Sequence, residues 1–179
     1  MKKTTFLLLM TVGILLFCAG CKSNKPVIPG DNNTVEQPAK KATMPQGRLM
    51  HVMYNYSGMA RMPYSNFNLI RTDSGKSSFS FWHGSEMSFE NIPDSLFDAL
   101  RRVIEEEHMY EYESYYGLPR ELEQGMLDGY SWSFDAVFEN KERISSSGRH
   151  VSPDGMGLRK IEDLLVKAAQ NYTKDNEEW

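Results

Sequence analysis

The chain has 179 residues, of which 24 are acidic and 20 basic, and a formal net charge of −4. This length suits a leader followed by one domain, and the acidic balance excludes the basic surface that nucleic-acid-binding proteins carry. Both cysteines, Cys18 and Cys21, lie near the N-terminus. The rest of the chain therefore has no thiol for a disulfide, a thiolate zinc site or a cysteine nucleophile.

Residues 1–21 have the three parts of a secretory signal. Two lysines precede an uncharged apolar run over residues 6–17, and two small residues precede Cys21. The run is marginal in length for a bilayer span, which needs about 20 apolar residues, and no cationic stop follows it. We therefore expect cleavage rather than a transmembrane anchor.

Because it ends on Cys21, this segment resembles the signal of bacterial lipoproteins, in which the cysteine is lipidated and becomes the new N-terminus. Cys18 stands where that family more often has leucine. The resemblance implies acyl chains such as palmitate on Cys21, and two or three chains hold a protein to a bilayer almost permanently. Cleavage also leaves 18 basic against 24 acidic side chains, a net charge of about −6.

Residues 22–46 contain four prolines and show no apolar period. Such a stretch cannot bury enough apolar surface to offset its ordering entropy, so we predict a disordered tether with a reach of about 25–30 Å. By resemblance to lipoprotein sorting, Lys22 in place of aspartate favours the outer membrane. Lys22 and Lys25, without an acidic cluster, favour its periplasmic side over the cell surface.

Residues 47–179 have the length of one domain. Alternating apolar side chains and turn sequences predict four strands in its first half, at residues 48–56, 65–72, 77–82 and 87–90. The turn sequence at residues 73–76 joins the second and third strands as a hairpin. Pro93 and Asp94 suit a helix start, and the apolar period that follows predicts a helix ending near His108.

Residues 113–128 contain several tyrosines, glycines and a proline, and we predict a long loop with one helical turn at residues 120–124. Loops of this length often carry function. Two further strands are predicted at residues 130–138 and 143–147, and a final amphipathic helix at residues 158–172. Each helix has one apolar stripe, so the predicted fold is a two-layer α+β domain: a mostly antiparallel sheet of about five or six strands covered by two helices.

This order of elements resembles the small uncharacterised α+β domains that are common in cell-envelope lipoproteins of Gram-negative bacteria. The resemblance covers most of residues 47–171 and is one of layout. Those families have no established activity to transfer, so it bears on the fold alone.

Metal and catalytic sites are not supported by the spacing of their residues. Met50, His51 and Met53, followed by Met59 and Met62, have copper-ligand chemistry, but a strand directs Met50 and Met53 to opposite faces. Glu105 and His108 have the spacing of a di-iron pair, yet such sites need pairs from two helices. The serines at 145–147 lie near His150 without a nucleophile elbow, and a polar strand face explains them. We predict no catalytic residue, metal or cofactor.

The surplus of aromatic side chains is the best candidate for a binding surface. They could form a platform for a sugar ring or a partner protein; alternatively, they cover an end of the sheet and direct their hydroxyl groups to water. The candidate platform consists of Trp82, His83, Tyr110, Tyr112, Tyr115 and Tyr116.

The sequence therefore predicts a lipid-anchored cell-envelope protein with a non-catalytic binding role toward a protein or a glycan. A hydrolase acting on envelope polymers is the alternative, and a pocket that brings His150 or His83 near two acidic groups favours it. A third hypothesis, an inert structural lipoprotein, predicts no concave site.

Overall fold

The computed structural model describes residues 42–58, 62–119, 122 and 129–177. The predicted signal with Cys21 and most of the predicted tether lie outside these ranges. The elements in chain order are β1 (Leu49–Ser57), β2 (Ser65–Arg71), β3 (Ser77–Trp82), β4 (Glu86–Glu90), α1 (Asp94–Glu106), the 3-10 turn η1 (Met109–Glu111), β5 (Tyr115–Gly117), β6 (Ser131–Phe138), β7 (Arg143–Arg149) and α3 (Gly157–Glu177).

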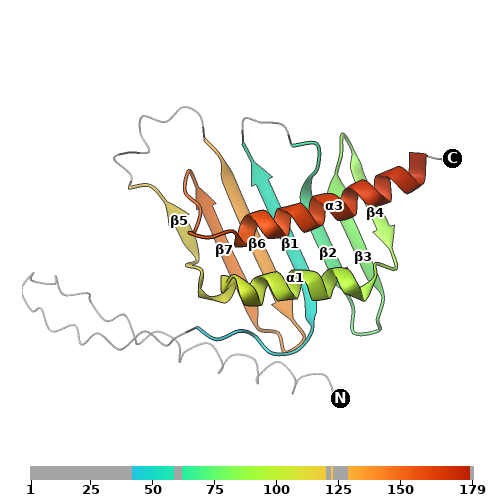
Figure 1. Ribbon diagram of the computed structural model, residues 1–179, viewed down its shortest axis with the longest axis horizontal. Helices are drawn as coiled ribbons and strands as arrows, with labels where there is room; N and C mark the ends of the chain where they lie inside the picture. Colours follow the sequence, from blue (N-terminus) through green and yellow to red (C-terminus); the bar gives the residue numbers. More distant parts are fainter. Residues whose placement is uncertain (1–41, 59–61, 120–121, 123–128, 178–179) are drawn as a thin grey trace, which may run out of the picture. The chain divides into compact units, whose positions relative to one another are not determined.

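The described strands form one sheet of seven, in the order β4-β3-β2-β1-β6-β7-β5. All neighbours are antiparallel except β5 and β7, which are parallel. Both helices lie across the same face of this sheet (Figure 1). The predicted two-layer α+β class is therefore confirmed, and the sheet is mixed and has one strand more than the predicted upper count.

The additional strand is β5, which lies within the predicted loop at residues 113–128. Its three residues pair with β7, with Tyr115 opposite Ser147 and Gly117 opposite Arg149. This strand could not be predicted from the sequence, because three residues are too few to show an alternation of apolar and polar side chains. The attachment comes instead from β7, where the Ser146 hydroxyl donates to the carbonyl of Glu113 at 2.6 Å. Most of the helical turn predicted at residues 120–124 lies outside the described part of the chain.

The core lies between the sheet and the two helices. It contains apolar side chains at alternate positions of β2, β3 and β6 and one stripe from each helix, as the periodicity predicts. The stripe of α1 is Phe97, Leu100 and Ile104, and that of α3 includes Ile161, Leu165 and Ala169. Each large apolar side chain buried in this way stabilises the fold by about 1.5–3 kcal/mol.

The packed domain includes residues before the predicted boundary at residue 47. Pro45 is buried, and Met44 packs against the core cluster. A register shift between Leu49 and His51 lets both Leu49 and Met50 face the core. These contacts are set by tertiary packing, which a proline-rich composition does not indicate.

The face of the sheet opposite the helices is polar. His51 lies there with its Nε2 atom 2.7 Å from Oδ1 of Asn68 on β2, and the Asn55 side chain donates to the Ser133 hydroxyl at 3.2 Å. His51 is thus on the other face from the buried Met50.

Candidate binding groove

The sheet order separates the residues of the predicted platform into two groups. Trp82 and His83 lie at the end of β3, whereas Tyr110, Tyr112, Tyr115 and Tyr116 lie in and before β5. Four strands, β2, β1, β6 and β7, stand between β3 and β5. The six residues therefore do not form one surface.

Tyr112 and Tyr116 pack against the core, in line with the alternative prediction that the aromatic side chains cover an end of the sheet. Their rings meet edge to face with centroids 6.2 Å apart, and Tyr116 lies 5.9 Å from the Trp132 ring. Burial is the main cause that raises the pKa of Tyr112 to about 12. These rings close the core next to β5, and Tyr112 stays protonated at neutral pH.

Tyr110 and Tyr115 have separate surroundings. The Tyr110 hydroxyl lies 2.7 Å from Nδ1 of His108, which precedes η1 in the left-handed conformation with φ of 50°. Tyr115 pairs with Ser147, which in turn pairs with Ser133 on the polar face of the sheet. Tyr115 is 55% exposed there, on the face opposite Tyr116.

Trp82 and His83 stand beside the connection between β1 and β2. The His83 ring stacks on Tyr64 with centroids 4.5 Å apart and an interplanar angle of 15°, and its Nδ1 atom lies 2.7 Å from the carbonyl oxygen of Pro63. Trp82 remains 47% exposed. A fixed histidine and an exposed indole therefore border this end of the sheet.

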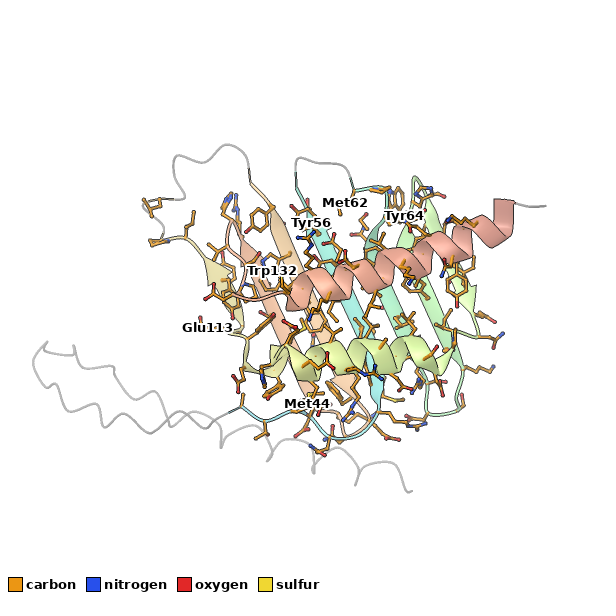
Figure 2. All side chains as sticks on the ribbon, viewed as in Figure 1. Met44, Tyr56, Met62, Tyr64, Glu113 and Trp132 are labelled. Carbon is orange, nitrogen blue, oxygen red and sulfur yellow. The ribbon has the colours of Figure 1, made fainter. Side chains whose placement is uncertain are left out.

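Two adjoining cavities follow this end of the sheet. One has a volume of about 700 Å³ and is bordered by Trp82 and His83; the other has a volume of about 490 Å³ and lies against Trp132 and the first half of α3. Tyr56 and Met62 line both cavities. We call the two together the strand-end groove. Figure 2 shows Tyr56, Met62, Tyr64 and Trp132 along one side of α3, with Met44 at the opposite end of the domain.

Exposed apolar side chains are concentrated in the strand-end groove. The described residues have five large apolar side chains that are exposed, namely Met62, Trp82, Tyr115, Leu122 and Met156. Three of these line the groove: Met62, 37% exposed, Trp82, 47%, and Met156, 46%. Clustered apolar exposure marks interaction sites, whereas single exposed apolar residues are ordinary.

The walls of the groove are held by ring stacking and hydrogen bonds. Tyr56 stacks on Tyr130 with centroids 5.9 Å apart, and the Tyr130 hydroxyl lies 3.3 Å from that of Ser152. The Trp132 indole N–H donates to the carbonyl of Val151 at 2.8 Å. These contacts fix the segment before α3 against β6, so the groove is formed before any ligand binds.

One carboxyl group lies in an unfavourable position within the groove. Glu162 on α3 is half-buried, and this burial, followed by the nearby charge of Asp163, raises its pKa. The nearby Tyr54 hydroxyl and the guanidinium of Arg159 partly offset this rise in the pKa. Burial is also the main cause that raises the pKa of Tyr54, so Tyr54 stays a donor.

The predicted catalytic candidates do not meet in one cavity of the described structure. Glu162 and Asp163 line the smaller cavity, His83 lines the larger one, and His150 lines neither. Ser146 and Ser147 hydrogen-bond to backbone carbonyls of the segment that enters β5. Within the described residues no three His, Cys, Asp or Glu side chains gather closely enough to hold a metal ion.

The sequence analysis did not identify Tyr56, Met156 or Glu162 as site residues, and it considered Met62 only as a copper ligand. A partial signal exists on α3, where Leu158, Glu162 and Val166 follow one another at intervals of four and place a carboxyl in an apolar row. The residues of β1 that face this row lie about a hundred positions earlier in the chain. No local pattern brings them together.

The chain matches no protein-family model and no curated protein sequence. None of the helices in the described ranges combines the length and the apolar character that crossing a bilayer requires.

Proposed function

We propose that the chain is a lipid-anchored cell-envelope protein, held by Cys21 at the periplasmic side of the outer membrane, whose domain binds a partner in the strand-end groove without chemical transformation. The partner is a protein or a glycan of the envelope. The observation that carries the binding role is the gathering of Met62, Trp82 and Met156, all exposed, around adjoining cavities.

Two features favour binding over an inert structural role. The cavities, of about 490 and 700 Å³, fall in the size range of ligand sites in proteins. Their apolar lining is exposed to water in the free protein, which is unfavourable and has no role in a purely structural domain. A partner that covers Met62 and Met156 removes this apolar surface from water, which favours binding.

The hydrolase alternative receives less support from the same geometry. A general base must reach the proton that it removes, at about 2.6–3.2 Å or through one water. His83 is stacked on Tyr64 in the larger cavity, while the two carboxyl groups line the smaller one. The groove therefore offers apolar contact area, whereas its histidine and its carboxyl groups line different cavities.

Affinity capture from solubilised envelopes tests the proposal. The full chain and a variant carrying Met62→Ala and Met156→Ala are used as bait under equal conditions. We expect a partner that co-purifies with the wild type and is lost or strongly depleted with the double variant, because truncating central apolar anchors typically weakens binding by more than 1 kcal/mol each.

The matched control is Tyr115→Ala, which removes a side chain that is more exposed than either methionine and lies on the opposite face of the sheet. It should retain the partner. Equal recovery by wild type and the double variant, with both proteins folded by circular dichroism, contradicts binding in the groove.

A further inference from the structure

We infer that the strand-end groove accepts a peptide segment of a partner protein in which apolar side chains flank a lysine or arginine that pairs with Glu162. The inference rests on the proposed binding function and adds the chemical class of the ligand to it. It is carried by the charge of the groove, by the burial of its carboxyl group and by the kind of apolar surface that it exposes.

The charged side chains of the groove favour a cation. The smaller cavity is lined by Glu162, Asp163 and Arg159, and these leave a net negative charge. Among the described residues that line the larger cavity, His83 is the only addition that can carry a charge. The whole chain is also acidic, so the long-range field attracts cationic ligands and repels anionic ones.

Glu162 is a stronger partner for a cation than a carboxylate on the open surface. Its side chain is half-buried beside Tyr54, so part of its desolvation has already occurred in the free protein. An ion pair between fully exposed groups contributes little because both must lose water. A charge-assisted hydrogen bond to a partly desolvated carboxylate contributes more.

The apolar surface of the smaller cavity suits side chains better than sugar rings. Stacking against a sugar needs an exposed aromatic face, but Tyr54 and Trp132 are only 3% and 4% exposed, and one face of the Tyr56 ring is covered by Tyr130. The most exposed apolar side chains of this cavity are Met156, 46% exposed, and Met62, 37% exposed. Thioether side chains are flexible and polarizable, and they adapt to apolar side chains of different shapes.

Fluorescence anisotropy with labelled, end-capped peptides tests this inference on the full chain in a non-ionic detergent. The probes are three peptides of equal length in which leucine alternates with lysine, with glutamine or with glutamate, and a labelled chito-oligosaccharide represents glycans. We expect saturable binding of the leucine–lysine peptide, about tenfold weaker binding of the leucine–glutamine peptide, and no binding of the other two probes.

The Glu162→Gln variant should weaken binding of the leucine–lysine peptide about tenfold and leave that of the leucine–glutamine peptide unchanged. Glu106→Gln is the matched control, because it changes the net charge equally at an exposed position on α1 that lines neither cavity. It should bind all peptides as the wild type does. Urea unfolding of each variant shows whether it is folded.

Two outcomes overturn the inference, and they separate it from the proposed function. If Glu162→Gln and Glu106→Gln weaken lysine-peptide binding equally, or if the oligosaccharide binds and the peptides do not, the assigned ligand class is wrong, while binding in the groove stands. If peptides bind equally to wild type and to the variant with Met62→Ala and Met156→Ala, the groove is not the binding site, and both proposals fail.

Discussion

The ionised carboxylate of Glu162, which we propose to bind a cation, is less favourable in the folded domain than in the unfolded chain. Burial raises its pKa above the ordinary 4.5, so the folded state holds this proton more tightly than the unfolded state. The contribution of Glu162 to the free energy of unfolding is therefore most favourable at pH values below its pKa in the unfolded state. This contribution is lost as the pH rises through its pKa in the folded state. The groups that face it are the Tyr54 hydroxyl, Asp163 and Arg159.

Replacing Glu162 by glutamine should therefore leave the domain at least as stable as the wild type at pH 7. We expect a gain under about 1 kcal/mol, because half of the carboxyl is solvated and its charge is screened. The gain should shrink when the pH falls to the ordinary glutamate pKa of 4.5. Urea unfolding of both proteins at the two pH values measures it.

Glu106→Gln again serves as the control and should show no such pH-dependent gain. A variant less stable than wild type at pH 7 would mean that the Tyr54 hydroxyl and Arg159 hold the carboxylate more strongly than burial destabilises it. A carboxyl group whose burial costs stability is typical of functional sites.

Among the elements, the hairpin of β2 and β3 was fully predictable. Phe79 and Phe81 alternate with serines, and the turn at residues 73–76 contains Gly75 with φ of 82°. The predicted strand at residues 77–82 coincides with β3. Local sequence is sufficient where an element has its own period and its own turn.

β5 shows the opposite case, since its position depends on side chains of another strand. The Ser146 hydroxyl, on a residue that is 1% exposed, donates to the Glu113 carbonyl, and the Ser147 amide donates to the Ser114 carbonyl at 3.1 Å. The sequence analysis explained these serines by a polar strand face. Their hydrogen bonds instead attach a neighbouring strand, which no periodicity reveals.

Ser146→Ala should destabilise the domain by about 1–2 kcal/mol, because it leaves a carbonyl without its buried donor. Hydrogen exchange at residues 113–117 should accelerate more than exchange in β6. Urea unfolding and amide exchange measured by mass spectrometry provide the two readouts.

Ser145→Ala is the matched control, since Ser145 is exposed on the same strand, and it should change stability by less than about 0.5 kcal/mol. Equal effects of the two substitutions, or faster exchange spread evenly over the sheet, would contradict a specific role of Ser146 in attaching β5.

At the scale of the whole domain, the central position of β1 creates the groove. β1 pairs with β2 on one side and with β6 on the other, so residues from the first half of the chain, such as Tyr56 and Met62, meet Trp132 and α3 from the second half. Strand order follows from long-range pairing, and a single sequence does not contain it. For this reason the sequence predicted one aromatic platform from residues that lie at separate places in the sheet.

The last prediction concerns how the whole chain is held in the cell envelope. If Cys21 receives the acyl chains, Cys21→Ser should abolish the lipid mass and move the protein from the membrane to the soluble fraction, because stable anchoring needs at least two chains. Cys18→Ser is the matched control: it removes the neighbouring thiol and should leave acylation and membrane association intact. Mass spectrometry of protein from fractionated Gram-negative cells measures both, and an unmodified, uncleaved N-terminus in the cytosolic fraction would refute the anchor.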